Sequence, residues 1–384
     1  MKFLYLQVNK DWDVSIKESL CTLEQTVMDF SFPEDINTRE FVVLSEENRY
    51  ALAERLQKKD YDFIFSASYV HEVSVFCNML GVIYLSWTFE YPNMDILRDS
   101  VSNPCNCFFL SDKTEIERLR SLGVENVFYL PIGAKKLRLW KEEETKEEYQ
   151  VGYMGKILEA DPHSCFAQES VLAAESRGYL DGLVHCQRII YGMNLLKEDV
   201  PAYVLTELKE KYPLFIPAGV LVSEWEIYLK KWIYNRVSSQ ERQVLLQEND
   251  DVVTVFSKDR KAYKYFSKTK VLGEDIERNE VIAKSSINLH IVDRQLQSGI
   301  PAEVFEIMSQ GGFLLCNYWP DIEEFFVAEE DYMYFEDALD LVKKISFFSR
   351  NKNIRREMAK RAYDKVANEH LVIHRVERML QILL

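Results

Sequence analysis

The chain has no long apolar run, no basic run and no regular set of cysteines. No stretch approaches the roughly 18 apolar residues that a membrane span requires, so we expect no integral membrane segment. Its 62 acidic and 47 basic residues give a formal net charge of −15. Because nucleic-acid binding depends on a basic surface, this charge predicts that the protein has no nucleic-acid partner.

The seven cysteines lack the spacing of a zinc site or of a disulfide framework. The only close pair, Cys105 and Cys107, would share one face of a strand with no further ligand nearby, which predicts buried thiols rather than a metal site. Residues 1–11 contain an apolar stretch that is too short for a secretion signal, and they predict a first β-strand. We therefore expect a reduced, cytoplasmic protein.

Over residues 1–140, short apolar runs alternate with helical patterns. A chain of 384 residues is long enough for two domains with a cleft between them. The helix lengths match crossovers in a parallel sheet, so we predict a doubly wound α/β domain. Strands are expected at residues 3–8, 41–44, 63–66, 82–86, 107–110 and 127–130, and helices at residues 14–29, 46–58, 71–80 and 113–122.

A charged segment at residues 141–148 follows this part of the chain. We interpret it as the boundary between a first Rossmann-like domain at residues 1–148 and a second at 149–366; an exposed helix on a single domain is the alternative. Residues 158–248 are helical in pattern and predict an insertion in the second domain. Residues 367–384 predict a helix that packs back towards the first domain. Strands of the second domain are expected near residues 149–154, 252–256, 286–292, 312–317 and 332–335.

Residues 298–317 combine a turn of small residues, an amphipathic helix, a Gly-Gly break and an apolar strand. A turn that leads into a helix leaves backbone N–H groups free and aims the positive end of the helix dipole outward, which suits a diphosphate. Glu306, about one turn into the helix, would then accept hydrogen bonds from ribose hydroxyls. The alternative is a plain α/β unit in which Glu303, Glu306 and Gln310 form a solvated helix face.

Several motifs together resemble a known family. In the second domain they are Ser285-Ser-Ile-Asn-Leu-His-Ile291, Arg294, Ser298-Gly-Ile-Pro301, Val304-Phe-Glu306, Gly311-Gly-Phe-Leu-Leu315, Asn368-Glu-His370 and Arg375. This block resembles the C-terminal domain of the CgeB-like spore-maturation glycosyltransferases. The accompanying N-terminal module of that family is similar to Tyr61-Asp-Phe-Ile-Phe-Ser66, Ser86-Trp-Thr-Phe-Glu-Tyr-Pro92, Tyr129-Leu-Pro131 and Val151-Gly-Tyr-Met-Gly155.

The resemblance implies a GT-B glycosyltransferase, with two Rossmann-like domains facing a cleft and the acceptor bound on the N-terminal side. Such an enzyme moves a sugar from a nucleotide-sugar donor, here favoured to be a UDP-sugar, to a hydroxyl acceptor on a protein or a surface glycan. The nucleotide sugar is a substrate, so no cofactor is expected. GT-B enzymes generally act without a bound metal, and no Asp-x-Asp follows a suitable strand, so we expect no metal.

The resemblance also implies the donor-binding residues. In related enzymes a Glu on this helix holds the ribose, and Glu306 stands at that position. The wider retaining group has a second Glu eight positions earlier, where this chain has Ser298, so that contact with the donor sugar is missing or replaced. The full expected set is Ser298, Gly299, Ile300, Phe305, Glu306 and Arg294, with Gly155 and Lys156 at the end of the first strand of the second domain.

Position 303 departs from the family pattern, because Glu303 stands where relatives often have Arg. Stabilising a leaving diphosphate normally requires Arg, Lys, backbone N–H groups or a metal. Arg294 and Lys284 are candidates to replace the missing cation; the alternative is that both are solvated surface residues.

The catalytic residues should come from the N-terminal domain, because the acceptor approaches the anomeric carbon from that side. We predict Glu90, which follows a strand, and His71, which opens a helix. The alternatives are a loop carboxylate for Glu90 and a capping or packing role for His71. Trp12 could stack on an acceptor sugar, and His370 is interpreted as a structural joint.

Two further readings compete with an active enzyme. One is a GT-B-like binding or scaffold protein without catalysis, which the Glu at position 303 favours. The other is a phosphorylase-like enzyme with pyridoxal phosphate, but no lysine stands out for that role. The helical insertion is expected to bind the acceptor or to mediate an oligomer.

Overall fold

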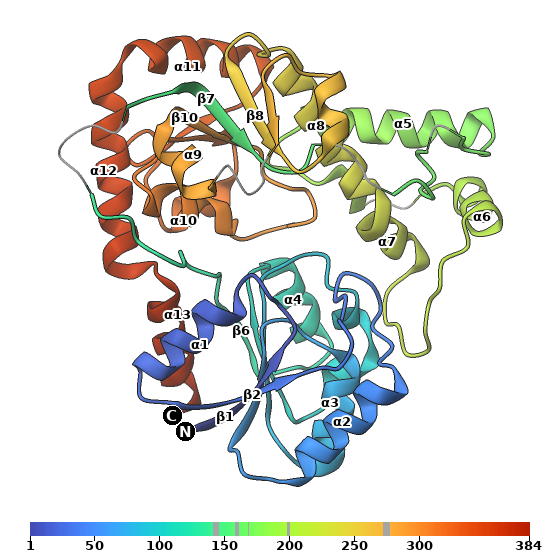
Figure 1. Ribbon diagram of the computed structural model, residues 1–384. Coiled ribbons are helices and arrows are strands. Elements are labelled where there is room, and N and C mark those ends of the chain that lie inside the picture. The colour runs from blue at the N-terminus through green and yellow to red at the C-terminus, as the bar shows by residue number, and fades with distance from the viewer. Residues whose placement is uncertain (141–145, 158–160, 168, 198–199, 272–276) are drawn as a thin grey trace.

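The computed structural model describes residues 1–384 apart from 141–145, 158–160, 168, 198–199 and 272–276. Most of the predicted boundary segment therefore lies outside the described residues. The described strands form two six-stranded sheets, ordered β2-β1-β3-β4-β5-β6 and β12-β11-β10-β7-β8-β9, and all of their pairings are parallel. Helices cover both sheets (Figure 1). This confirms the predicted architecture of two doubly wound α/β domains.

In the first sheet the side chains of β1 alternate between two cores, as the pleat of a strand requires. Leu4 and Leu6 join one core, while Phe3 and Tyr5 join the other. The strands are β1 (Lys2–Gln7), β2 (Thr26–Ser31), β3 (Phe63–Ser66), β4 (Tyr84–Thr88), β5 (Asn106–Leu110) and β6 (Val127–Tyr129). The helices between them are α1 (Asp13–Thr22), α2 (Glu46–Gln57), α3 (His71–Leu80) and α4 (Lys113–Ser121).

The strand predicted at residues 41–44 is wrong. Val42 and Leu44 are buried, but their backbone N–H groups donate to the carboxylates of Asp95 (3.1 Å) and Glu72 (2.8 Å) instead of to a neighbouring strand. The edge strand β2 occupies part of the segment that was predicted as helix. Carboxylates distant in sequence thus accept the backbone hydrogen bonds that a neighbouring strand would otherwise accept.

The second sheet comprises β7 (Tyr149–Met154), β8 (Val253–Ser257), β9 (Thr269–Val271), β10 (Ser285–His290), β11 (Leu314–Asn317) and β12 (Met333–Phe335). Its main helices are α8 (Tyr234–Gln247), α9 (Arg278–Lys284), α10 (Ala302–Ser309), α11 (Ala338–Arg350) and α12 (Lys352–Glu369). Among the described helices, none combines the length and the apolar character that a membrane crossing demands.

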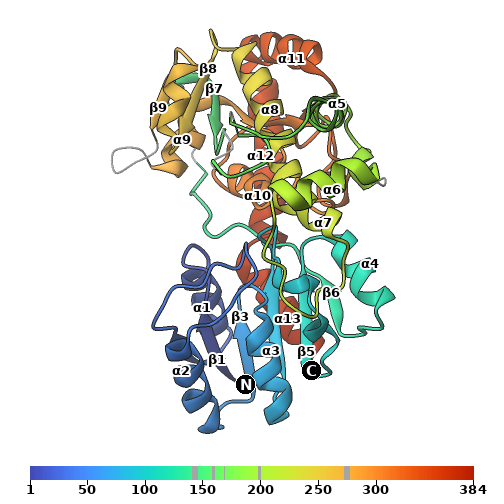
Figure 2. The ribbon, with the colours of Figure 1, turned by 90° about the vertical axis from the view of Figure 1, so that its right-hand side faces the viewer.

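The helical insertion reaches down onto the first domain. Within its predicted bounds, residues 158–248, lie α5 (Ala174–Ile189), α6 (Ala202–Lys211), α7 (Glu224–Tyr228), a π-helical segment (Leu229–Ile233) and α8. Figure 2 shows the loop between α6 and α7 descending beside the first sheet. In this loop Val220 pairs with Arg98, and Gly219 O accepts the Asp99 N–H at 2.7 Å. A buried ion pair, Lys230 Nζ to Glu115 Oε1 at 2.7 Å, adds a second tie between the insertion and α4.

The last helix, α13 (Val372–Leu383), lies beside α1 (Figure 1). Its Val372, Val376 and Met379 pack in the same core as Phe3 and Tyr5. The C-terminal end of the chain therefore contributes to the first domain.

The two sheets meet through the turn that precedes α10. Asp112 caps α4 through one carboxylate oxygen and accepts the Gln297 N–H with the other at 2.8 Å. Gly299 has φ +91°, and a Cβ on it would lie 1.9 Å from the Ser111 carbonyl oxygen. Lys113 pairs with Asp321 at 2.9 Å. Position 299 therefore requires glycine both for its left-handed backbone and for this close approach.

We predict that Gly299→Ala destabilises the protein more than Gly81→Ala. Gly81 also has a left-handed φ, +67°, but a Cβ there would meet nothing within 4 Å, so only the conformational cost of about 1–2 kcal/mol applies. At Gly299 the carbonyl of Ser111 must also move, so we expect a larger fall in thermal unfolding temperature. Equal shifts for the two variants, measured by circular dichroism, would contradict a tight contact at this turn.

Candidate functional site

The helix α10 presents two carboxylates on one side. It starts after Pro301 and ends at Gln310, ahead of Gly311 with φ +75°. Val304, Phe305 and Met308 are buried in the core of the domain. Glu303 and Glu306 are three residues apart, so they are neighbours on the helix surface, and both remain partly exposed.

Glu306 lies between two cations from other elements. Its Oε2 is 3.1 Å from Arg278 Nη2 of α9. Its Oε1 is 4.0 Å from Nζ of Lys135, which lies in the interdomain segment between β6 and β7. Burial raises the pKa of the Glu306 carboxyl, and Arg278 opposes that rise. The predicted ribose-binding carboxylate is therefore held by positive charge on both oxygens.

Glu303 is influenced by several basic side chains. Although burial acts to raise its pKa, His290, Arg278 and Arg242 bring the pKa of Glu303 below its usual value. Arg242 of α8 is buried, pairs with Asp293 at 2.9 Å and donates to the Lys156 carbonyl at 3.3 Å. Arg242 and Arg278 are thus the two arginines whose charges act on Glu303.

His290 ends strand β10 and is 8% exposed. Burial lowers the pKa of its imidazole to about 4, against the pull of Glu303. Within the described part of the chain, its Nε2 has no hydrogen-bond partner. A neutral imidazole therefore lies at the carboxyl end of the second sheet, beside the start of α10.

Glu90 approaches this group from the first domain. It follows β4, where strand ends line the opening of a parallel sheet. Burial raises the pKa of the Glu90 carboxyl, Arg39 opposes the rise, and the negative charges of Asp11 and Glu303 add to it. The charges of Glu90 in the first domain and Glu303 in the second therefore influence each other.

The structure does not bring His71 to this cleft. Its Nδ1 lies 2.6 Å from Ser100 Oγ and its backbone N–H donates to Asp95. Burial, and then Arg98, lower the pKa of the imidazole to about 4. The prediction of His71 as a second catalytic residue beside Glu90 is corrected, because all of these contacts belong to the body of the first domain.

Three other predicted contacts are also corrected. Phe305 is fully buried against Phe325 and His370, so its ring cannot touch a nucleotide. Arg294 is buried in a pair with Glu241, 3.2 Å away. Trp12 is 5% exposed and its ring face is covered by Lys135, which leaves no face for an acceptor sugar.

Of the remaining predicted residues, those of the turn at 298–300 lie at the domain junction. Ser298 donates to Asp321 at 3.2 Å, Gly299 abuts Ser111, and Ile300 is buried. This turn is thus packed against the first domain rather than open above. Gly155 and the exposed Lys156 follow β7. Lys284 pairs with Glu148 and Glu280 on the surface.

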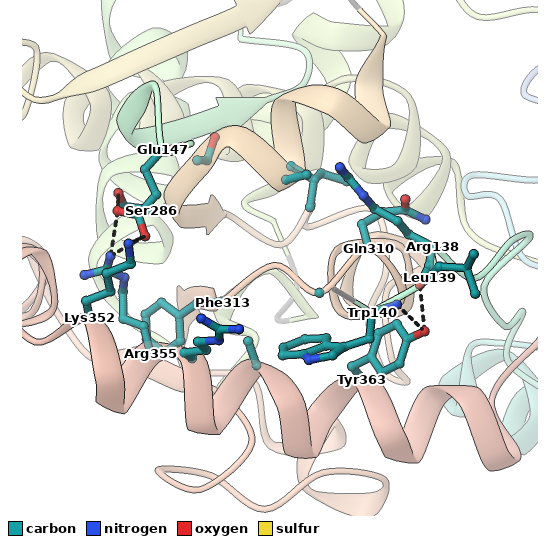
Figure 3. Close-up of a pocket in the computed structure, with 16 residues that line it drawn as sticks. Arg138, Leu139, Trp140, Glu147, Ser286, Gln310, Phe313, Lys352, Arg355 and Tyr363 are labelled. Carbon is teal, nitrogen blue, oxygen red and sulfur yellow. Dashed lines mark hydrogen bonds and ion pairs between the residues drawn. The ribbon is translucent and has the colours of Figure 1, made fainter. Parts of the chain in front are cut away.

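A separate pocket lies at the amino end of strand β10, at the opposite end of the second sheet's strands from the start of α10 (Figure 3). It is bounded by the start of β10 at Ser285, by Trp140 and by α12. Trp140 donates its backbone N–H to the Tyr363 hydroxyl at 3.2 Å, and Arg355 pairs with Glu147 at 2.9 Å. Because β10 runs from this pocket to the cleft, the two sites are at opposite ends of the same strand. Within the described residues, no group of three or more His, Cys, Asp or Glu could hold a metal ion.

The fold and the cleft define a GT-B architecture, and comparisons with known proteins agree. Residues 245–381 match the family model described as glycosyl transferase-like. No curated protein sequence matches the chain.

Solved structures share the fold at low identity. Sucrose-phosphate synthase from Thermosynechococcus elongatus is 11% identical, with a TM-score of 0.54, over 100% of this chain and 98% of that one. Anabaena HepE in complex with UDP-glucose is 10% identical, with a TM-score of 0.53, over 100% and 99% of the two chains. S. aureus TarM is 11% identical with a TM-score of 0.49; the match covers 87% of this chain but only 58% of TarM. The likeness to sucrose-phosphate synthase and HepE shows that the chain has the GT-B glycosyltransferase fold.

Sequence reasoning missed several charged groups of the cleft. They are Asp11, Lys135, Arg242, Arg278 and His290. His290 lies inside the motif at residues 285–291, so its position at a strand end was a usable signal. The others approach Glu303, Glu306 or Glu90 only through the tertiary fold, and no local pattern marks them.

We predict that His290 makes the protein less stable in acid. The imidazole has a folded pKa of about 4, against 6.5 for its ordinary value, so the unfolded state takes up the proton first as the pH falls. The contribution of His290 to the free energy of unfolding should therefore fall between pH 6.5 and 4 and level off below, and His290→Gln should remove up to about 3 kcal/mol of the acid loss in that range. Urea unfolding at several pH values would measure this, with the exposed His163→Gln as control. If His290→Gln and His163→Gln lose the same free energy of unfolding between pH 6.5 and 4, the prediction is wrong.

Proposed function

We propose that the protein is a glycosyltransferase that moves a sugar from a nucleotide-sugar donor to a hydroxyl acceptor. The observation that carries the proposal is the position of Glu306 on α10 of a GT-B fold, 3.1 Å from Arg278 and 4.0 Å from Lys135. Glu90 of the first domain, whose carboxyl feels the charge of Glu303, supports it. A transferase needs groups from both domains, because donor and acceptor bind to different domains and react between them.

Each group then has a chemical task. Glu306 accepts hydrogen bonds from the ribose hydroxyls, and Arg242 and Arg278 offset the charge of the diphosphate. Glu90 accepts the proton of the acceptor hydroxyl as its oxygen bonds to the anomeric carbon. The bond from that carbon to the diphosphate breaks, and the nucleoside diphosphate leaves with the electron pair. With protein cations in this role, we propose a reaction that needs no metal and no cofactor.

A UDP-sugar is the donor we favour, and a hexose the transferred group. HepE, which shares the fold, was solved with UDP-glucose, and this supports the choice by analogy alone. The motifs that resemble the CgeB-like family support a hydroxyl on a protein or a surface glycan as acceptor, and a cytoplasmic site of action. The helical insertion, which adjoins the cleft through Arg242, is proposed to contribute to acceptor binding or to an oligomer contact.

One observation favours the second candidate, a GT-B-like binding protein without catalysis. The turn at residues 297–299, expected to face a diphosphate, is packed against Ser111 and Asp112. A protein that keeps this contact with ligand present would bind a nucleotide through Glu306 without turning it over. Turnover of a donor distinguishes the two candidates.

We predict that a nucleotide sugar raises the melting temperature of the wild type and is turned over, and that Glu306→Ala weakens both effects. A ligand that binds only the folded state stabilises it, by about 2.7 kcal/mol at one hundred times Kd. Thermal shift and donor hydrolysis would be measured over a panel of nucleotide sugars. Glu54→Ala, at an exposed position on α2, is the matched control and should behave as wild type. If no nucleotide sugar shifts the wild type, the proposed function is wrong.

We predict that Glu90→Gln lowers kcat roughly 10²–10⁴-fold with little change in donor affinity, because it removes a general base without removing a donor contact. Since burial raises the pKa of Glu90, wild-type activity should fall on the acid side at a pH above 4.5, the ordinary value. Measuring kcat of the wild type and of Glu90→Gln at several pH values would test both points. A Glu90→Gln enzyme with wild-type kcat would exclude Glu90 as the base.

A further inference from the structure

The segment that follows β6 is hydrogen-bonded, just before Lys135, to the connection between α12 and α13. Ala134 donates its N–H to the His370 carbonyl at 2.8 Å and accepts the Val372 N–H at 3.0 Å. A Cβ on Gly133 would lie 2.4 Å from the His370 carbonyl oxygen. The backbone that carries Lys135 is therefore held in one place, against the connection between α12 and α13.

The ammonium of Lys135 links the two walls of the cleft. It lies 4.1 Å from the centroid of the Trp12 ring, in the first domain, and 4.0 Å from Glu306 Oε1, in the second. Trp12 is buried and packs edge-on against Phe89, next to Glu90, at 5.4 Å. A cation above an indole face is attracted by the ring, so Lys135 has a favourable partner on each side.

The residues that follow Lys135 are hydrogen-bonded to the end of α10. Gln310 Nε2 donates to the Lys136 carbonyl at 3.1 Å, and Arg138 N–H donates to the Ser309 carbonyl at 3.1 Å. Because Glu306 lies one turn earlier on the same helix, the spacing between Lys135 and Glu306 is fixed by the backbone. The distance between the two charges is therefore not set by flexible side chains alone.

From these contacts we propose that Lys135 is a positioning residue for the donor: it holds the Glu306 carboxylate for the ribose and keeps the Trp12–Glu90 wall in register with it. The inference rests on the proposed function. Arg278 holds the other oxygen of Glu306. A carboxylate has about four acceptor sites on its two oxygens, so a carboxylate fixed by two cations still has sites left for ribose hydroxyls. Without Lys135, Arg278 is the one remaining cation among the described residues that forms an ion pair with Glu306.

The test is donor affinity and turnover in Lys135→Met, with Lys136→Met as the matched control. Lys136 is the exposed neighbour, and only its backbone has a role in the contacts above. With UDP, GDP and dTDP as calorimetric probes, and the matching glucose donors for kinetics, we expect Lys135→Met to weaken Kd and raise KM roughly tenfold with kcat within about twofold. Lys135→Arg, which keeps the charge over Trp12, should restore most of the affinity.

A double-mutant cycle with Glu306→Gln tests whether Lys135 acts through Glu306. In that background Lys135→Met should have little further effect on Kd, since the carboxylate that it positions has lost its charge. If the wild type binds none of the three nucleotides, the proposed function and this inference both fail. If the wild type binds but Lys135→Met binds as tightly, or the two substitutions are additive, only the inference fails.

Discussion

The contact between the turn before α10 and the start of α4 is the constraint on which the cleft depends. Ser111 can approach Gly299 only because that residue has no Cβ, and Asp112 caps α4 while holding the Gln297 N–H. This junction sets the carboxyl ends of the two sheets against each other. The insertion and α13 then tie the domains at other points, through Lys230–Glu115 and the core around Phe3. As a consequence, the charge of Glu303 in the second domain acts on Glu90 in the first.

Although its net charge is −15, the protein gathers cations from separate elements around the carboxylates of α10. They are Arg242 from α8, Arg278 from α9 and Lys135 from the segment between β6 and β7. In the proposed reaction these cations offset the charge of the donor diphosphate.

Much of the fold could be predicted from the sequence, because the alternation of strands and helices is a local pattern. The strand expected at residues 41–44 failed because its N–H groups find the carboxylates of Asp95 and Glu72, which no local pattern reveals. At the site, the position of Glu306 followed from helix spacing. The same spacing should have marked Phe305 as a core residue, since it points away from Glu306. Lys135 and Arg278 could not be found, because they meet Glu306 only after folding.

The ion pairs of the cleft also bear on how a donor enters. Without ligand, Glu306 pairs with Arg278, whose side chain is 43% exposed, and such solvated pairs contribute about 0–1 kcal/mol. Sharing or breaking this pair therefore costs little, and Arg278 can turn towards a diphosphate while Lys135 keeps Glu306 in place. Arg242 is different, because it is buried and paired with Asp293, so losing that partner would leave an uncompensated charge. The carboxylates of α10 are thus influenced by one adaptable cation and one fixed cation, and in the proposed reaction the fixed cation constrains the position of the diphosphate.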